Sequence, residues 1–151
     1  MLYIFMGQSC TGKSTMANKV KEIIGAKIYA GKDYLRMAKG EKEAWELFYR
    51  KLTDAASNRD SLEKSIIYLI AEKEQLDRII NIKGSYKVRF TATIEVIKSR
   101  FAQRMHGRLP EPVEKMLDRQ YEEWKNVKGD VEIDTTVERD VEKLINLIKS
   151  Q

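Results

Sequence analysis

Residues 7–15 read GQSCTGKST, and they follow directly on the apolar run LYIFM at residues 2–6. The two glycines, with lysine and serine after the second, have the spacing G-x-x-x-x-G-K-S, which is typical of a phosphate-binding loop. Glycine accepts positive φ angles and lets the backbone approach a ligand closely, so successive N–H groups can turn inward around a phosphate. The apolar run before the loop and a helical pattern at residues 14–24 provide the strand–loop–helix order of this motif. A glycine turn that binds nothing is therefore disfavoured.

The residues of this loop have expected roles toward Mg·ATP. The helix that follows would present its unpaired N–H groups and positive dipole end to the phosphates. Lys13 would reach the β- and γ-phosphates, and Ser14 would offer a hydroxyl ligand to Mg²⁺. Cys10 is expected to be a small loop side chain rather than a nucleophile. The predicted nucleotide-binding residues of the loop are Gly7, Ser9, Cys10, Thr11, Gly12, Lys13, Ser14 and Thr15.

Length and composition narrow the class of protein. The 151 residues suit a single domain, residues 1–151, with a substantial core. A net charge of +5 fits an anionic substrate but does not by itself indicate nucleic-acid binding. No apolar run approaches the roughly 20 residues that cross a bilayer, the loop interrupts the only N-terminal apolar run, and the single cysteine cannot form an internal disulfide. We therefore expect a cytoplasmic protein without a signal peptide or membrane association, either a monomer or a homodimer.

Short apolar runs alternate with helical patterns along the chain. This alternation predicts a parallel sheet with helices on both faces, and ligands of such sheets bind at the carboxyl ends of the strands. The first helix is expected to turn Met16, Val20, Ile23 and Ile24 to one side. The predicted strands are residues 2–6, 26–30, 65–71, 87–92 and 131–135, and the predicted helices are residues 14–24, 41–57, 74–80, 94–105, 113–124 and one that includes 141–148.

Asp33 and Arg36 follow the second predicted strand, at the same sheet edge as the loop. Asp33 could accept a proton from an acceptor hydroxyl or hold Mg²⁺ through water. Arg36, about one helical turn later, would face the same side and could bind an anionic group of the acceptor. The alternative is an aspartate that caps a helix, with a surface arginine beside it. The phosphate-binding loop favours the functional interpretation, in which Lys13 and Asp33 are catalytic.

A basic segment follows the fourth predicted strand. Arg100 and Arg104 are four residues apart on a predicted helix, so they share a face, and like charges there repel unless an anion lies between them. Arg108 follows a glycine ahead of Pro110. Residues 100–112 are therefore expected to form a lid, with Arg100 and Arg104 as catalytic residues that stabilise the transferred phosphoryl group. The alternative is a solvated basic helix face.

Two further ionisable residues are open to more than one interpretation. Glu72 follows the third predicted strand, where a metal-directed carboxylate and a charged start to the next helix explain it equally well. His106 could titrate near neutral pH, but among arginines it is expected to be an ordinary loop side chain.

The loop, the pair Asp33 and Arg36, and the lid arginines together resemble the P-loop kinases, which include the adenylate, shikimate, gluconate and polynucleotide 5′-kinases. The polynucleotide 5′-kinase pattern is the most similar, and it implies that Asp33 is the base toward an acceptor hydroxyl and that Arg36 contacts an acceptor phosphate. The resemblance covers nearly the whole chain. It implies an α/β/α sandwich with sheet order 2-3-1-4-5, nucleotide contacts from Arg104, and a segment at residues 134–137 that places Thr135 near the adenine.

The chain also departs from these relatives. It lacks the glycine triplet of shikimate kinases and the long acceptor domain of guanylate kinases. Residues 33–64 could form a short acceptor-side helical region in its place, although Tyr34, Arg50 and Arg59 are expected to be surface residues. Thr135 and Glu138 have the spacing of a capping box at the start of the final helix.

The expected function is transfer of the γ-phosphate of Mg·ATP to a small-molecule or nucleotide acceptor that carries a hydroxyl or an anionic group. The first alternative is a nucleoside monophosphate kinase of the guanylate type, and the second is a P-loop ATPase without an acceptor. A guanine-reading N-K-x-D motif is missing from the sequence, which disfavours a GTPase switch. The intact Lys13 and Ser14 disfavour a binding module without catalysis. Nucleic acid is expected only as an acceptor end, because no aromatic and basic stripe is present.

Overall fold

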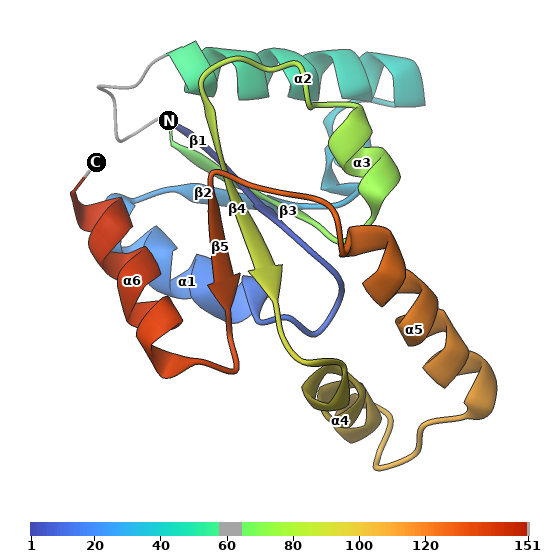
Figure 1. Ribbon diagram of the computed structural model, residues 1–151. Helices are drawn as coiled ribbons and strands as arrows, with labels where there is room; N and C mark the ends of the chain where they lie inside the picture. The colour runs from blue at the N-terminus through green and yellow to red at the C-terminus, as the bar shows by residue number, and fades with distance from the viewer. Residues whose placement is uncertain (58–64, 151) are drawn as a thin grey trace.

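The computed structural model describes residues 1–57 and 65–150 (Figure 1). Within these residues, five parallel strands form one sheet in the order β2-β3-β1-β4-β5. This order confirms the sheet that the sequence and the family resemblance imply. The strands are β1 (Leu2–Met6), β2 (Lys27–Ala30), β3 (Ile66–Ile70), β4 (Ser85–Thr91) and β5 (Val131–Asp134).

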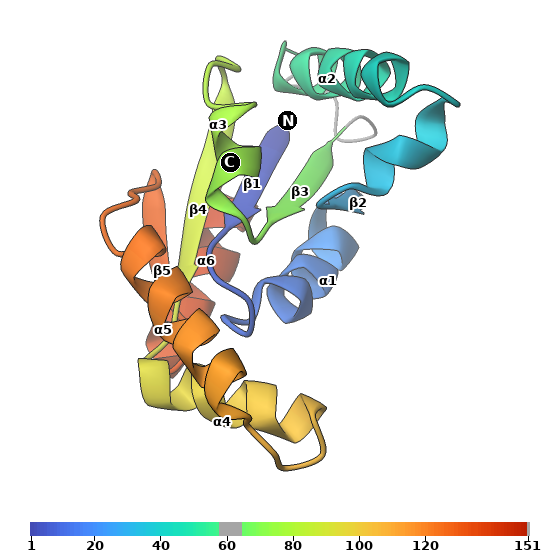
Figure 2. The same ribbon diagram turned by 90° about the vertical axis from the view of Figure 1, so that its right-hand side faces the viewer.

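Helices cover both faces of the sheet and make three layers (Figures 1 and 2). Buried side chains of α1 and α6 pack on one face, and those of α2 and α3 pack on the other. The central strands β1 and β3 are buried at every position, as the continuous apolar runs predict for strands covered on both faces. The helices are α1 (Lys13–Ile24), the 3₁₀ helix η1 (Asp33–Met37), α2 (Glu41–Ser57), α3 (Lys73–Asp77), α4 (Ile94–Arg104), α5 (Glu111–Trp124) and α6 (Glu138–Lys149).

Two details of the helices differ from the sequence expectation. Ile23 is 40% exposed, because it lies at the border of the apolar stripe of α1; Ala17 is buried instead. The predicted helix at residues 74–80 is shorter, since α3 ends at Asp77 and the chain continues in turns.

Helices α4 and α5 form a hairpin that projects beyond the end of the sheet where β4 and β5 terminate (Figures 1 and 2). A small cluster of buried residues joins this hairpin to the loop after β1. Cys10 of the loop packs there with Ala92, with Ile97 of α4 and with Leu117 of α5. The expected lid, residues 100–112, is therefore the end of α4, the connecting turn and the start of α5. The expected acceptor-side helical region, residues 33–64, is described only as far as residue 57. Arg59 therefore lies outside the described residues. No helix in the described part of the chain is long and apolar enough to cross a membrane.

Phe48 is the centre of the packing between α2 and the sheet. Its side chain is fully buried, and its ring lies 4.9 Å from the Tyr68 ring and 5.3 Å from the Tyr29 ring, centroid to centroid. Leu47, the preceding residue on the same helix, is 42% exposed. Substitution of Phe48 therefore tests the packing of the core, and substitution of Leu47 tests the effect of a side chain on the helix alone.

We expect Phe48→Ala to lower the free energy of unfolding by about 3–5 kcal/mol, because it opens a cavity in the core. Leu47→Ala is the matched control and should cost less than about 1 kcal/mol, since the side chain is exposed. Denaturant unfolding with an unchanged m-value measures both. Equal losses for the two variants would contradict this packing.

Candidate functional site

The glycine-rich loop, residues 7–15, joins β1 to α1 (Figure 2). Gly7 has φ 145° and Gly12 has φ 84°, in the region that favours glycine. A Cβ on Gly7 would overlap the carbonyl oxygen of Phe90, and a Cβ on Gly12 would lie 2.9 Å from Cγ2 of Thr135. Gly12 is the N-cap of α1 and provides no side-chain cap, so the first N–H groups of that helix remain available to a ligand.

Lys13 is the first residue of α1, and its side chain folds back under the loop. Its Nζ donates hydrogen bonds to the carbonyl oxygens of Gly7, at 2.6 Å, and Gln8, at 2.8 Å. Burial lowers the pKa of Lys13 to about 8, with a smaller upward effect of Cys10 and a smaller downward effect of the Arg104 guanidinium. A second cation thus lies close enough to disfavour the charge on Lys13.

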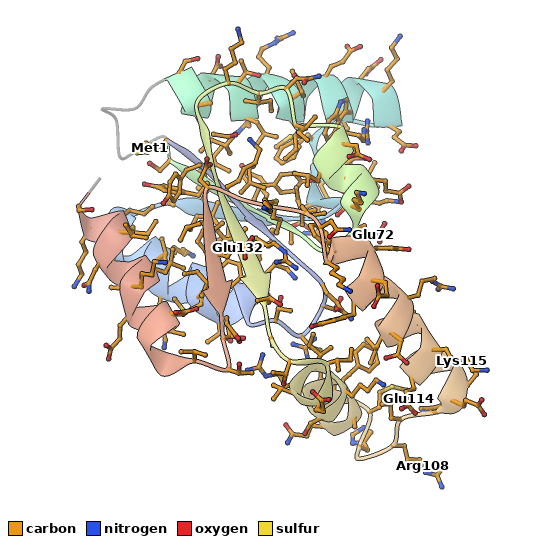
Figure 3. All side chains as sticks on the ribbon, in the orientation of Figure 1. Met1, Glu72, Arg108, Glu114, Lys115 and Glu132 are labelled. Carbon is orange, nitrogen blue, oxygen red and sulfur yellow. The ribbon has the colours of Figure 1, made fainter. Side chains whose placement is uncertain are left out.

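A hollow of about 380 Å³, which we call the loop hollow, opens over these residues. Its lining combines the loop with the ends of two neighbouring strands and one arginine of the hairpin. Eight polar or charged side chains line it: Ser9, Lys13, Ser14, Thr15, Lys32, Glu72, Gln75 and Arg104. Glu72, which the sequence leaves undecided, lies just beyond β3, beside α3 (Figure 3). The ends of β1, β2 and β3 meet here because parallel strands bring their carboxyl ends to one edge.

Arg100 and Arg104 lie on α4 but have different surroundings. Nη1 of Arg100 donates to the carbonyl oxygen of Cys10, at 2.9 Å, and to Oγ1 of Thr135, at 3.0 Å. Arg104 is exposed and lines both the loop hollow and an adjoining outer hollow of about 500 Å³, which Arg100, Thr135 and Val141 also line. In this conformation Arg100 holds the loop in place, and Arg104 is the hairpin arginine that faces the loop hollow.

The hydroxyl of Thr135 does not cap the final helix. Val137 is the N-cap residue of α6 and provides no side-chain cap, so the expected capping box is wrong. The Thr135 hydroxyl instead accepts from Arg100 and donates to the carbonyl oxygen of Thr91, at 3.4 Å. The hydroxyl therefore bonds to residues that are distant in the sequence rather than to the N–H groups of α6. The Thr135 side chain also lies against Gly12.

Arg108 and His106 lie in the turn between α4 and α5. Arg108 is exposed, and its side chain points away from the sheet (Figure 3). His106 is also exposed and has φ 61°. Neither residue lines the loop hollow or the outer hollow in this conformation.

Asp33 and Arg36 lie on η1, where residues three apart eclipse one another, so both are on one side as expected. Both are exposed. Oδ2 of Asp33 accepts the backbone N–H of Ala30, at 2.9 Å, and Asp33 does not line the loop hollow, although its neighbour Lys32 does. The roles of both residues toward an acceptor stay predictions.

No family model matches the sequence, and no curated protein matches it. Solved structures do match. A shikimate kinase from Bacteroides thetaiotaomicron is similar with a TM-score of 0.65 at 11% identity, over 99% of this chain and 98% of that chain. The YorR protein from Bacillus subtilis, in complex with phosphorylated GDP, has a TM-score of 0.64 at 23% identity, over 99% and 96%. A gluconokinase from Sinorhizobium meliloti 1021 has a TM-score of 0.60 at 16% identity, over 98% and 93%.

This chain has the P-loop kinase fold. In this chain the loop hollow lies at the sheet edge that carries the glycine-rich loop. Ligands of parallel α/β sheets bind at this edge, where the carboxyl ends of the strands meet. The match to these structures extends along nearly the full length of each chain, so it includes the residues of the α4–α5 hairpin in this chain.

The residues at the loop hollow fit Mg²⁺. The exposed Ser14 and Glu72 side chains line it and offer a hydroxyl and a carboxylate, which are the oxygen donors that Mg²⁺ prefers. No group of three His, Cys, Asp or Glu side chains gathers to hold a metal in residues 1–57 and 65–150. Mg²⁺ does not need such a group, because it keeps several waters and takes substrate phosphates as ligands. Asp33, the other predicted ligand, lies outside this lining.

Sequence reasoning missed several residues of the site. Lys32 and Gln75 line the loop hollow, and Gln8 is buried with Nε2 donating to the carbonyl oxygen of Leu117, at 2.8 Å. Gln8 and Gln75 belong to no motif of the sequence, and their partners are distant in the chain. Lys32 could have been suspected only because it precedes Asp33 in the sequence.

We expect affinity for Mg·ATP to fall as pH rises through the pKa of Lys13, about 8. Below this pH the ammonium is charged and would attract a triphosphate; above it the free protein would have to take up a proton on binding. The dissociation constant should therefore rise by up to about tenfold per pH unit above the pKa. Calorimetric titration at several pH values measures this slope. Lys13→Arg, which stays charged, should show no such slope whatever its absolute affinity, and the same slope in that variant would contradict the assignment.

We expect Arg100→Met to lower the free energy of unfolding by about 1–3 kcal/mol and to weaken Mg·ATP binding, because the carbonyl oxygen of Cys10 and the Thr135 hydroxyl lose a charged donor. Arg104→Met, on the same helix but exposed, should leave stability within about 0.5 kcal/mol and weaken nucleotide binding. Thermal or denaturant unfolding separates the two. Unchanged stability in Arg100→Met would show that this arginine does not hold the loop.

Proposed function

We propose that this protein is an ATP-dependent phosphotransferase that binds Mg·ATP at the loop hollow. The observation that carries the proposal is the meeting of two cations, Lys13 and Arg104, over backbone N–H groups at the start of α1. No ion pair among the described residues involves either side chain. A polyanion would replace their mutual repulsion with attraction, and the triphosphate of a nucleotide is a polyanion of suitable size. The shared fold with several kinases supports this assignment.

The transfer step follows from these positions. An acceptor oxygen attacks the γ-phosphorus of ATP while the bond from that phosphorus to the β–γ bridging oxygen breaks, and the electron pair leaves on ADP. Lys13 and Arg104 stabilise the negative charge that spreads over the moving group. Ser14 and Glu72 would hold Mg²⁺, which when bound neutralises charge on the β- and γ-oxygens. Closure of the hairpin would bring Arg104 nearer and exclude water.

The class of acceptor decides whether Asp33 is needed. A hydroxyl acceptor must lose a proton, and Asp33 is the candidate base. An acceptor phosphate is already ionised and needs no base. One oxygen of Asp33 is bound to the N–H of Ala30, and the carboxylate stands outside the loop hollow. This observation favours the second candidate function, a nucleoside monophosphate kinase.

The test is a panel of nucleosides, nucleoside monophosphates, sugar acids and 5′-hydroxyl oligonucleotides incubated with labelled ATP and Mg²⁺. We expect one class to become labelled, and Lys13→Met to lose turnover by at least about a hundredfold because the transferred charge loses its cation. Lys21→Met, an exposed lysine on the same helix, should leave turnover unchanged. ADP formed at a rate that no acceptor alters would overturn the transferase assignment and support an ATPase.

Within the same assay, Asp33→Ala distinguishes the two acceptor chemistries. A loss of turnover beyond about a hundredfold with ATP binding retained would identify a hydroxyl acceptor that needs a base. A mild loss would identify an acceptor phosphate.

A further inference from the structure

A third hollow, of about 370 Å³, lies beside the loop hollow, between α2 and α3. Three aromatic residues form its walls, so we call it the aromatic hollow: Tyr34 of η1, Trp45 of α2 and Tyr68 of β3. The Tyr34 ring meets the Trp45 ring edge to face, at 5.1 Å between centroids, and stacks on the ring of Phe48, at 5.7 Å. Tyr68 is 1% exposed, and its hydroxyl donates to the carbonyl oxygen of Gly31, at 2.7 Å. These contacts fix the walls from three separate elements.

Arg78 is held in one orientation at this hollow. Its guanidinium lies 3.7 Å from the centroid of the Trp45 ring, and Nη1 donates to the Tyr34 hydroxyl, at 3.1 Å. A guanidinium stacked in this way keeps its plane fixed, and its remaining N–H groups stay available along one edge. Arg78 is exposed overall, so this edge can reach a ligand.

Two carboxylates line the same hollow. Glu41 is the first residue of α2 and Glu74 is near the start of α3, and both are exposed. In the part of the chain that the structure describes, no ion pair joins either glutamate to Arg78 or to any other cation. The hollow therefore offers unpaired hydrogen-bond acceptors and unpaired donors next to aromatic rings.

We propose that the aromatic hollow binds the guanine base of an acceptor nucleoside monophosphate; this rests on the proposed phosphotransferase function. Guanine has two acceptors on one edge, O6 and N7, which suit the N–H groups of an arginine. Its N1–H and N2–H groups are donors, which suit a carboxylate. Adenine presents an acceptor where guanine has N1–H, so a glutamate there would repel it. A sugar acid could use the arginine through its carboxylate, but the two glutamates that line the same hollow would repel that carboxylate.

The position of the hollow suits this acceptor. Lys32 and Gln75 line both the aromatic hollow and the loop hollow, so the two adjoin. A base in the aromatic hollow would place its 5′-phosphate toward Lys32 and the loop. One ionised oxygen of that phosphate attacks the γ-phosphorus of ATP, the bond to the β–γ bridging oxygen breaks, and the electron pair leaves on ADP. The second product is a guanosine diphosphate, and no proton has to be removed by Asp33.

Binding without ATP tests the base preference apart from phosphotransfer. The full chain is titrated with GMP, AMP, CMP and gluconate by calorimetry, with tryptophan fluorescence as a second readout because Trp45 lines the hollow. We expect GMP to bind at least about tenfold more tightly than AMP, the discrimination typical of a well-placed arginine–guanine contact. Equal affinities for GMP and AMP, or binding of gluconate alone, would overturn the inference.

Matched variants locate the contact. The double variant Glu41→Ala/Glu74→Ala should reduce the preference for GMP over AMP to about twofold, whereas Glu46→Ala, an exposed glutamate of the same helix, should leave it intact. Arg78→Met should weaken GMP binding about tenfold, and Arg119→Met, an exposed arginine of α5, should not. The preference is the ratio of the AMP and GMP dissociation constants of the same variant. Partial unfolding weakens binding of both nucleotides equally, so the ratio remains informative. An unchanged ratio in the double variant would overturn the assignment of the base to this hollow.

Titration with Mg·ATP alone separates this inference from the proposed function. Mg·ATP binding without a preference for GMP would overturn the guanine site and leave the phosphotransferase in place. GMP binding without Mg·ATP binding would overturn the phosphotransferase instead.

Discussion

The site depends on a stretch of backbone that has no room for side chains. Gly7 passes so close to the carbonyl oxygen of Phe90 that a Cβ would overlap it, and Gly12 lies against Thr135. Because the loop can pack between the ends of β1, β4 and β5 in this way, α1 begins with its N–H groups uncapped and with Lys13 folded beneath the turn. The position of the cation, the open helix end and the hollow all follow from this packing.

The same loop is tied to the α4–α5 hairpin from two directions. Arg100 of α4 donates to the carbonyl oxygen of Cys10, and Gln8 donates to the carbonyl oxygen of Leu117 in α5. Arg104, one turn further along α4, faces the hollow where Lys13 lies. Arg100 and Arg104 therefore lie on one helix, where the first contacts the loop and the second lines the hollow, so the position of the hairpin and the shape of the loop are linked through direct contacts.

Local patterns were enough to predict the strands, the helices and the position of the loop, because each depends on periodicity or on short-range spacing. The order of the strands in the sheet was implied by the family resemblance. Arg100 and Arg104 were predicted to share one helix and both lie on α4, but the sequence could not tell which of them faces the hollow. That difference depends on where the carbonyl oxygen of Cys10 and the Thr135 hydroxyl lie, and both are distant in the chain from Arg100. The capping box failed for the same reason, since a tertiary partner competes for the Thr135 hydroxyl.

The sequence by itself determined the parallel α/β architecture and a glycine-rich turn suited to phosphate, since apolar periodicity and glycine spacing act within a few residues of one another. Only the tertiary structure decided that Arg78 stacks on Trp45, that Glu41 and Glu74 line the hollow beside them, and that this hollow adjoins the loop. Trp45 and Glu41 lie on α2, Glu74 lies on α3 and Arg78 directly follows α3, and these two helices follow different strands. They meet because the sheet order places β3 between β1 and β2, a long-range arrangement that no short pattern encodes.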